Sequence, residues 1–329
     1  MSERTRAGIL GTGSGLPKRV LSNFDLEKMV ETSDEWIVTR TGIRERRIAE
    51  AGEATSDYVA IACEQAMTAA NVAAGDIDML ICATVTPDHA FPSTANVVQE
   101  RLGLTKASSF DLSAACSGFL YGLSLGTAMI EAGRAKYVLV AAGDLLSRIV
   151  DYTDRSTCVL FGDGAGAVVL GPIESDRGVL SVALHSDGRG KDVLYVAAGG
   201  SRKPASAETV ANGEHFIRMS GRDTFKFAVQ AMVSATEEVL ESSGLQPEDV
   251  ALYVPHQANL RIIDAARRRF HIPDERVALT LDKYGNTSAS SIVIALDEYV
   301  RAGRVGPGDV VLLVGFGAGL TWGAAAVRL

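Results

Sequence analysis

Apolar runs of strand length alternate along the chain with longer segments in which apolar residues recur at helical spacing. The continuous apolar runs predict buried strands at residues 8–10, 79–85, 137–142, 251–254 and 310–314. The helical spacing predicts helices at residues 55–73, 117–131, 223–243, 258–270 and 290–302. Strands that alternate with helices build βαβ units, so we expect an α/β protein with a mostly parallel sheet.

An internal repeat indicates that the chain is built from two similar α/β halves. The matching segments come in the same order in both halves, and they pair 75–80 with 247–252, 132–134 with 302–304, and 162–166 with 315–319. No linker rich in Pro, Gly or Ser separates the two sets. We therefore expect an N-terminal half, residues 1–175, and a C-terminal half, residues 176–329, packed together as one body.

Two glycine-rich segments resemble cofactor-binding loops but depart from the motifs. The first predicted strand stops at residues 11–17, where a leucine stands in place of the third glycine of a dinucleotide fingerprint. Residues 162–167 read G-x-G-x-x-A, but an apolar strand follows where that motif needs a helix, so we interpret them as a tight turn. The chain also lacks Walker A and H-E-x-x-H patterns. The usual sequence support for nicotinamide, ATP and zinc chemistry is therefore missing.

Composition narrows the classes of partner further. The net charge of −8 disfavours non-specific binding to nucleic acid. No apolar run reaches the roughly 20 residues that span a bilayer, and the first seven residues lack the apolar core of a secretory signal. The four cysteines show no metal-binding spacing. We therefore expect a cytoplasmic protein that binds no metal, nucleic acid or membrane and has at most one reactive thiol.

Cys116 is the cysteine whose position favours chemistry. It lies between a strand-like segment and the predicted helix 117–131, where the positive end of the helix dipole favours a thiolate. A buried structural cysteine is the alternative, and position alone leaves both interpretations open. In the second half of the repeat, Asn286 occupies the equivalent place before helix 290–302.

His256 is the histidine whose neighbours favour a site. It follows the predicted strand 251–254, and open α/β sheets place their sites at such strand ends. Gln257 and Asn259 gather with it beyond the strand. For a lone histidine a satisfied core or loop position is the usual interpretation, and we give it to the other four: His89, His185, His215 and His271.

Taken together, the motifs resemble the β-ketoacyl-acyl-carrier-protein synthase III family of the thiolase superfamily, over essentially the whole chain. The segments that carry the resemblance are Ser33-Asp-Glu-Trp-Ile37, Arg40-Thr-Gly-Ile43, Asp111-Leu-Ser-Ala-Ala-Cys116, Phe161-Gly-Asp-Gly-Ala-Gly166, His256-Gln-Ala-Asn259, Tyr284-Gly-Asn-Thr-Ser-Ala289 and Gly319-Leu-Thr-Trp-Gly323. The resemblance implies a thiolase-like fold, with duplicated βαβαβαββ halves that form a five-layered αβαβα core. It also implies a homodimer.

The resemblance implies a Cys–His–Asn triad of Cys116, His256 and Asn286. It places the oxyanion donors at the backbone N–H groups of Cys116 and Ala318. The implied reaction is decarboxylative condensation of a short acyl-CoA with malonyl-acyl-carrier protein, which initiates fatty-acid synthesis. Degradative thiolases use a second cysteine in the C-terminal half, and none follows Cys158 here.

The resemblance also assigns the contacts with substrate and partner, and it implies no cofactor beyond acyl-CoA as substrate. The residues assigned to CoA and pantetheine are Trp36, Arg40, Arg155, Gly221, Phe225 and Asn259. Phe91 corresponds to a residue that closes the acyl pocket of the other subunit. Carrier-protein binding is assigned to Arg261, Arg268 and Arg269, although a solvated helix face would also explain the last two.

Two alternatives remain at this point. An enzyme of secondary metabolism could use the same triad for polyketide priming, alkylquinolone formation or ester formation. The other alternative is not an enzyme but a non-catalytic acyl-binding or partner subunit, and the intact triad argues against it.

Overall fold

The computed structural model describes residues 6–173 and 176–329, and its core contains two mixed β-sheets. The first sheet has the strand order β1-β7-β6-β4-β5. Its strands are β1 (Arg6–Gly15), β4 (Met79–Ala83), β5 (Ser108–Leu112), β6 (Val138–Leu145) and β7 (Asp163–Ile173). Strand β4 runs parallel to β5 and β6, whereas β7 is antiparallel to β1 and β6. Every strand of this sheet precedes residue 174.

The second sheet repeats this arrangement, except that an isolated bridge replaces the fifth strand. Its order is β11-β12-β13-β8, from β8 (Gly178–Ser186), β11 (Val250–Pro255), β12 (Val310–Gly317) and β13 (Thr321–Arg328). Strand β11 is parallel to β12, and β13 is antiparallel to both of its neighbours. Where the first sheet has β5, this sheet has only a parallel bridge between Tyr253 and Val277.

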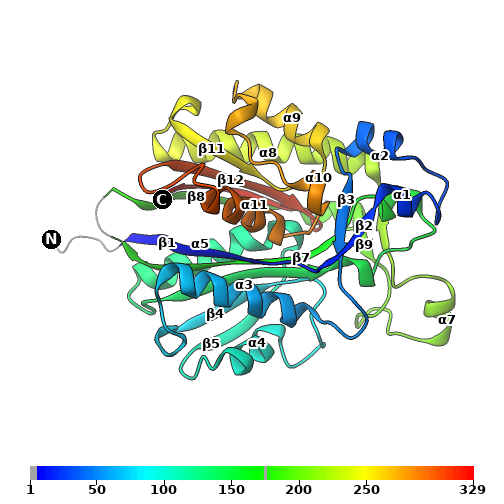
Figure 1. Ribbon diagram of the computed structural model, residues 1–329, viewed down its shortest axis with the longest axis horizontal. Helices are drawn as coiled ribbons and strands as arrows, with labels where there is room; N and C mark the ends of the chain where they lie inside the picture. The colour runs from blue at the N-terminus through cyan, green and yellow to red at the C-terminus, as the bar shows by residue number, and fades with distance from the viewer. Residues whose placement is uncertain (1–5, 174–175) are drawn as a thin grey trace.

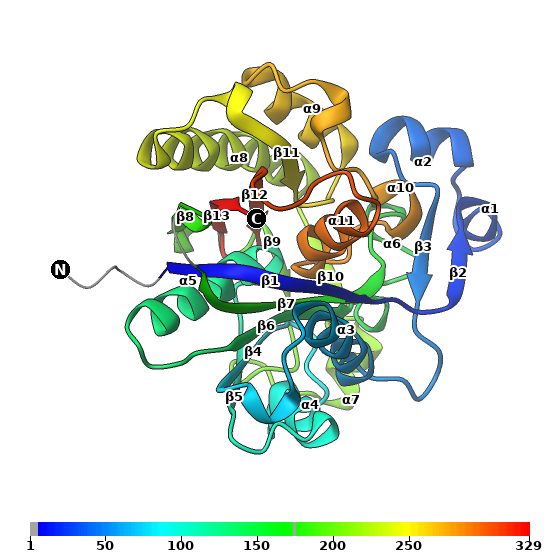
Figure 2. The same cartoon turned by 60° about the vertical axis from the view of Figure 1, so that its left-hand side comes forward.

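Helices separate and cover the two sheets, giving five layers (Figures 1 and 2). The central layer holds α5 (Gly118–Glu131) and α11 (Ser290–Arg301), whose apolar side chains share a core cluster with strands of both sheets. The outer layers are α3 (Thr55–Ala70) with α4 (Thr94–Leu102), and α8 (Gly221–Ser243) with α9 (Leu260–Arg269). The predicted αβαβα core is therefore confirmed. The predicted boundary at residue 175 falls outside the described residues, so the division into halves stays a proposal.

Shorter elements gather beside one end of the layered core (Figure 1), and some of them contribute residues to the cavities described below. They comprise β2 (Arg19–Ser22), α1 (Asn23–Leu26), α2 (Asp34–Thr41), β3 (Glu45–Ile48), α6 (Arg155–Cys158), β9 (Leu194–Val196), α7 (Ala207–Ala211), β10 (Ile217–Met219) and α10 (Leu281–Tyr284). Strand β2 pairs with β3, and β9 pairs with β10. Helix α2 begins at Ser33, whose side chain accepts a hydrogen bond from the Trp36 backbone.

Both glycine-rich segments were predicted incorrectly, for the same physical reason. Strand β1 continues through Gly11, Gly13 and Gly15 because these glycines face the backbone of α3: a Cβ at Gly13 would lie 2.3 Å from the Ala62 carbonyl oxygen. Residues 163–166 belong to β7 rather than to a turn, and a Cβ at Gly166 would lie 2.6 Å from Cβ of Val293 on α11. Here glycine allows a helix to pack closely on a strand, so residues 162–166 are not the counterpart of the turn that follows β12.

Candidate active site

Cys116 lies in a 3-10 turn, Ala115–Ser117, which connects β5 to the first residue of α5. The prediction that it opens a helix is confirmed. Cys116 is 8% exposed. The end of β12 packs closely against it, since a Cβ added at Gly317 would lie 2.6 Å from the Cys116 backbone nitrogen. Because residue 317 is a glycine, the turn that contains Ala318 can lie close to the Cys116 backbone.

Burial determines the resting state of the Cys116 thiol. Removal from water raises the pKa of this thiol to about 12, and the Ser288 hydroxyl, 3.6 Å from Sγ, opposes that rise by donating a hydrogen bond. The thiol therefore carries its proton at neutral pH until something accepts it. The three remaining cysteines, Cys63, Cys82 and Cys158, are buried and unbridged, as expected of core residues.

His256 directly follows β11 and is held from two sides. Its backbone N–H donates to the Val314 carbonyl at 2.7 Å, and its Nδ1 lies 2.7 Å from the Ser291 hydroxyl. That hydroxyl oxygen also accepts the Gln257 backbone N–H at 3.1 Å, so one serine holds both the ring and the backbone beside it. Burial lowers the pKa of His256 to about 3, so the imidazole is neutral and offers one N–H donor.

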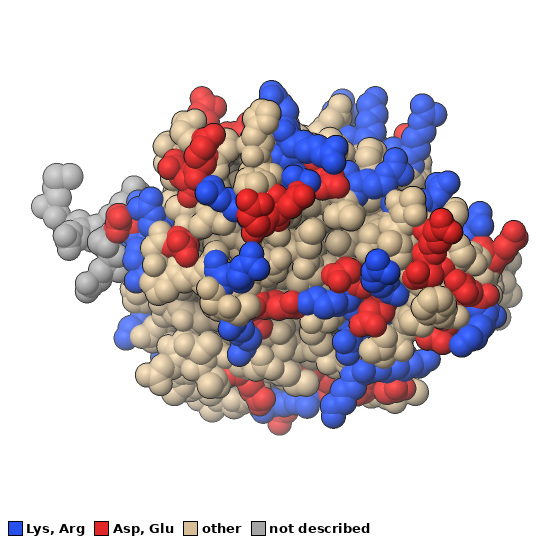
Figure 3. Space-filling model, turned by 45° about the horizontal axis from the view of Figure 1, so that its top comes forward, with Lys and Arg blue, Asp and Glu red and all other residues tan. Residues whose placement is uncertain are grey.

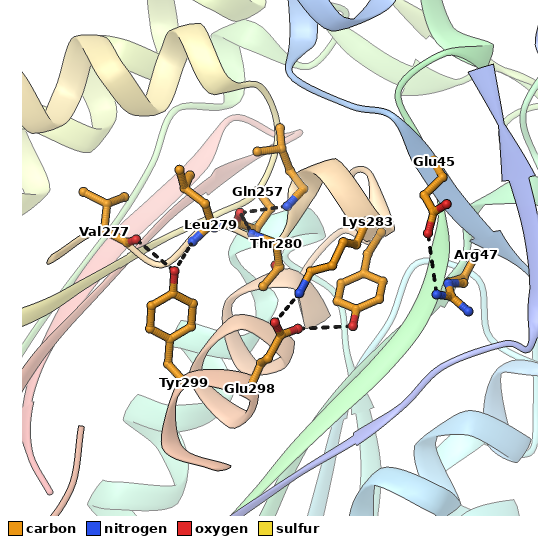
Figure 4. A network of polar contacts seen from close by, with 11 residues as sticks. Glu45, Arg47, Gln257, Val277, Leu279, Thr280, Lys283, Glu298 and Tyr299 are labelled. Atoms are coloured by element: carbon orange, nitrogen blue, oxygen red, sulfur yellow. Dashed lines mark hydrogen bonds and ion pairs between the residues drawn. The ribbon is translucent and has the colours of Figure 1, made fainter. Parts of the chain in front are cut away.

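Gln257 fixes the chain next to this histidine, and Figure 4 shows its side-chain oxygen at the Thr280 backbone. Its side-chain oxygen accepts the backbone N–H groups of Thr280 and Leu281, and its amide nitrogen donates to the carbonyls of Pro255 and Ala278. The buried amide therefore ties the end of β11 to the segment that leads toward Asn286. Its role is structural, although sequence analysis grouped it with His256.

Asn286 is oriented by its own loop. Its side-chain oxygen accepts the Ser288 backbone N–H at 2.9 Å, which leaves the Nδ2 amide group as the donor. Its backbone pairs with Leu160 and Gly162 across a parallel bridge. Before the loop, Lys283 and the Tyr284 hydroxyl both bind Glu298 on α11 (Figure 4). Asn286 thus presents a fixed, uncharged donor.

Cys116, His256 and Asn286 line one cavity of about 310 Å³. All six residues predicted to hold CoA and pantetheine line the same cavity, namely Trp36, Arg40, Arg155, Gly221, Phe225 and Asn259. The guanidinium carbons of Arg40 and Arg155 both lie 4.8 Å from the centre of the Trp36 ring. The Trp36 indole and the two guanidinium groups therefore line the same cavity as Cys116. Asn259 also caps α9 and donates to the Arg40 carbonyl, so it has a structural role as well.

A second cavity of about 240 Å³ adjoins Cys116 and Ala318. Its other walls are largely apolar and come from Val85, Ala115, Leu146, Ile149, Phe161, Leu194, Tyr195, Val196, Ile217 and Ser288. Phe91 is 87% exposed and lines neither of these two cavities in this chain. An acyl pocket was expected from the resemblance, but none of these wall residues, Ser288 included, was given a role in it.

Basic side chains lie on the outer surface of the molecule beside the larger cavity. Lysine and arginine gather along the upper part of the molecule in Figure 3, over α2 and α9. Arg261 lines the larger cavity and lies 5.7 Å from the centre of the Phe225 ring, while Arg268 and Arg269 are exposed further along α9. Arg267 is bound instead by Asp264 and Asp274.

Comparison with known proteins agrees with this geometry. The family models "3-Oxoacyl-[acyl-carrier-protein (ACP)] synthase III" and its C-terminal counterpart match residues 110–188 and 240–329. A β-ketoacyl-[acyl-carrier-protein] synthase III from Caldanaerobacter subterraneus subsp. tengcongensis is 56% identical over 100% of this chain and 99% of the relative. The chain belongs to the β-ketoacyl-[acyl-carrier-protein] synthase III family. The resemblance found in the sequence is thereby confirmed.

Solved synthase III structures superpose on the whole chain. The enzyme from Aquifex aeolicus is 47% identical with a TM-score of 0.91, covering 99% of this chain and 100% of that one. The priming β-ketosynthase of the R1128 polyketide pathway has a TM-score of 0.93 at 37% identity, covering 100% of this chain and 98% of that one. The fold is shared by both, so fold alone does not separate synthase III from polyketide priming.

Among residues 6–173 and 176–329, no helix combines the length and apolar character needed to cross a membrane. In the same residues, no group of three or more His, Cys, Asp or Glu side chains is arranged to hold a metal ion.

Proposed function

We propose that the protein condenses an acyl-CoA with malonyl-acyl-carrier protein, and that Cys116, His256 and Asn286 carry the chemistry. The observation that supports this most strongly is the shared cavity: one thiol and two uncharged donors line the same cavity as the six residues assigned to CoA and pantetheine. The synthase III relatives above half identity weigh against the polyketide-priming alternative.

In the first half-reaction, the Cys116 sulfur attacks the acyl-CoA thioester and CoA leaves. The tetrahedral oxyanion needs fixed donors, and the backbone N–H groups of Cys116 and Ala318 are the ones we assign. Support for that pairing comes from Gly317, whose missing side chain lets the two backbones meet. Removal of a single donor of this type typically lowers the rate by a factor of about 10²–10³.

In the second half-reaction, the malonyl thioester loses CO₂ and its carbonyl oxygen becomes an enolate. Nε2–H of His256 and the Nδ2 amide of Asn286 would donate to that oxygen. Both donors are neutral, so neither must lose a charge to act, and burial keeps His256 in this state because it lowers the pKa of the ring to about 3. The resulting carbanion attacks the acyl group on Cys116 and releases a β-ketoacyl product.

The binding residues follow from the same cavity. Trp36 and Arg155 would separate from their present 4.8 Å contact to hold the adenine between them, and Arg40 would contact phosphate, because guanidinium groups both stack on rings and pair with phosphate. The apolar pocket beside Cys116 would take a short acyl chain. We assign its closure to Phe91 of a second subunit, which is consistent with the exposure of that ring in a single chain.

The carrier protein would dock on the basic surface of α9. Arg261 stands at the entrance, with Arg268 and Arg269 beyond it. An acidic carrier that inserts a phosphopantetheine arm would be attracted to this face, although the chain as a whole is acidic.

The proposal predicts that two variants separate the half-reactions. Asn286→Ala should acylate Cys116 from acetyl-CoA within about tenfold of the wild-type rate but lose about 10²–10³ in condensation, because it lacks an enolate donor. Cys116→Ala should lose acylation entirely. Acylation is measured by protein mass, and condensation by formation of the ketoacyl-carrier product. Equal loss of both steps in Asn286→Ala would contradict this division of roles.

A further inference from the structure

Two hydroxyl groups join the backbone segments that carry the assigned oxyanion donors. Ser117 follows Cys116 directly and is fully buried. Thr321 begins β13, three residues after Ala318. The Ser117 hydroxyl donates to Oγ1 of Thr321 at 2.7 Å. Oγ1 of Thr321 lies 2.9 Å from the carbonyl oxygen of Ala114 and 3.1 Å from that of Ala318, and can donate its hydrogen to either. One threonine hydroxyl thus contacts both segments.

The segment before Cys116 must be held because its backbone is strained. Ala115 has a φ of 45°, in the left-handed region that side chains other than glycine rarely adopt. The carbonyl of the preceding peptide group, from Ala114, lies 2.8 Å from the Ser117 hydroxyl and 2.9 Å from that of Thr321. Because the Cys116 N–H belongs to the next peptide group, its direction depends on how this carbonyl is held.

The segment that contains Ala318 is held from the same point. Gly317 packs so closely on the cysteine turn that an added Cβ would lie 2.6 Å from the Cys116 nitrogen and 3.2 Å from the Ser117 nitrogen. This contact brings the two segments together but leaves the direction of their peptide groups open. The Thr321 hydroxyl restrains the Ala318 carbonyl, and thereby the residue whose N–H is the second assigned donor.

Thr321 lies behind these donors rather than in the site. Neither Thr321 nor Ser117 lines either of the two cavities beside Cys116. An oxyanion donor contributes most when it is already directed at the position where the charge develops. A hydroxyl that fixes two donors from behind can therefore affect the rate without contacting the substrate.

We propose that Thr321 is a positioning residue for the oxyanion site and that Ser117 orients its hydroxyl. The hydroxyl keeps the N–H groups of Cys116 and Ala318 directed at one point, where a thioester oxygen becomes negative in both half-reactions. This inference rests on the proposed function, which assigns those two N–H groups as donors.

A pair of variants at one position tests this role. Thr321→Val keeps the shape of the side chain and removes the hydroxyl, whereas Thr321→Ser keeps the hydroxyl. In single-turnover acylation by saturating acetyl-CoA, Thr321→Val should be about tenfold slower than wild type, because its donors are misdirected rather than lost. The half-saturating concentration of acetyl-CoA should stay within about twofold, since the substrate contacts are unchanged. Thr321→Ser should retain the wild-type rate to within about threefold.

Alkylation of Cys116 by iodoacetamide separates positioning from damage to the thiol. Alkylation requires the thiolate but forms no oxyanion, so its rate in Thr321→Val should stay within about twofold of wild type. A substitution that merely loosened the cysteine turn would change this rate as well. Labelling and acylation are both followed by mass on the peptide that contains Cys116.

Thr12→Val is the matched control. Thr12 is a buried threonine on β1 whose hydroxyl donates to Asp297 on α11 at 2.7 Å, so it also joins segments far apart in the chain. It lines neither cavity beside Cys116. Thr12→Val should acylate within about twofold of the wild-type rate even if it unfolds at a lower temperature. All rates are measured at a temperature at which circular dichroism shows each variant folded.

Three results would overturn the positioning role: a wild-type acylation rate in folded Thr321→Val, a parallel loss of alkylation in that variant, or an equal loss of acylation in Thr321→Ser. If Thr321→Val does not fold, Ser117→Ala decides, and it should show the same separation of acylation from alkylation. Absence of acylation in the wild type would contradict the proposed function and this inference with it, whereas each of the three results above leaves the proposed function intact.

Discussion

Burial sets the protonation state of each reacting side chain at the scale of single residues. It raises the pKa of the Cys116 thiol and lowers that of His256, so both are uncharged at rest. The Ser288 backbone N–H occupies the Asn286 side-chain oxygen and leaves its Nδ2 group as the donor, while the Ser291 hydroxyl holds the His256 ring. A site of neutral donors suits a reaction in which negative charge appears only in the intermediates.

The buried His256 makes folding sensitive to acid. Unfolded, this histidine binds a proton near pH 6.5, whereas folded it does so only near pH 3. Its contribution to the free energy of unfolding is therefore complete above about pH 6.5 and is lost as pH falls toward 3. Chemical denaturation from pH 7 to 4 should show wild type losing up to about 1.4 kcal/mol more per pH unit than His256→Gln.

An exposed histidine provides the control for that measurement. His89→Gln should follow the wild-type curve, because His89 lies on the surface. A constant difference in unfolding free energy between wild type and His256→Gln across this pH range would show that His256 titrates normally in the folded protein.

The three residues to which we assign the chemistry were named from the sequence, whereas the side chains that hold them were not. Cys116, His256 and Asn286 are recognisable because each is a distinctive residue type beyond a predicted strand or before a predicted helix. Ser288 and Ser291 belong to a run of small hydroxyl residues that resembles any polar loop. Asp144 follows the predicted apolar strand 137–142 as an isolated acid, and only the tertiary structure shows that it is buried.

At the scale of elements, glycine decides how closely α3 approaches β1. Gly13→Ala places a Cβ against the Ala62 carbonyl, so it should lower the free energy of unfolding by about 1–3 kcal/mol in urea denaturation. Gly75→Ala is the control: no atom lies within 4 Å of its added Cβ, and its effect should stay within about 0.5 kcal/mol. Equal effects of the two substitutions would mean that backbone entropy rather than packing governs Gly13.

The long helices and buried strands were predicted well because their periodicity reflects burial. Helix α5 and helix α11 lie within one residue of the predicted bounds. The second half of β1 and the start of β7 were mistaken for glycine-rich turns, because a glycine that accommodates a neighbouring helix looks the same in sequence as one that permits a turn. The difference depends on which element packs opposite, which a single sequence does not specify.

At the scale of the whole molecule, the repeated sheets bring distant residues to one cavity. Cys116 comes from the connection between the first sheet and α5, while His256 and Asn286 come from equivalent connections around the second sheet. The repeat found in the sequence therefore has a functional consequence. Neither sheet alone assembles the thiol with its two donors.

The central claim is that an acyl group passes from CoA to Cys116 and then to a carrier-bound malonyl unit. Mass spectrometry of the wild-type protein, incubated with acetyl-CoA, tests it most directly. We predict an acetyl mass increase on the peptide that contains Cys116, which disappears when malonyl-acyl-carrier protein is added and a β-ketoacyl-carrier product forms. Absence of acylation from acetyl-CoA and from longer acyl-CoAs, or acylation at another residue, would contradict the account.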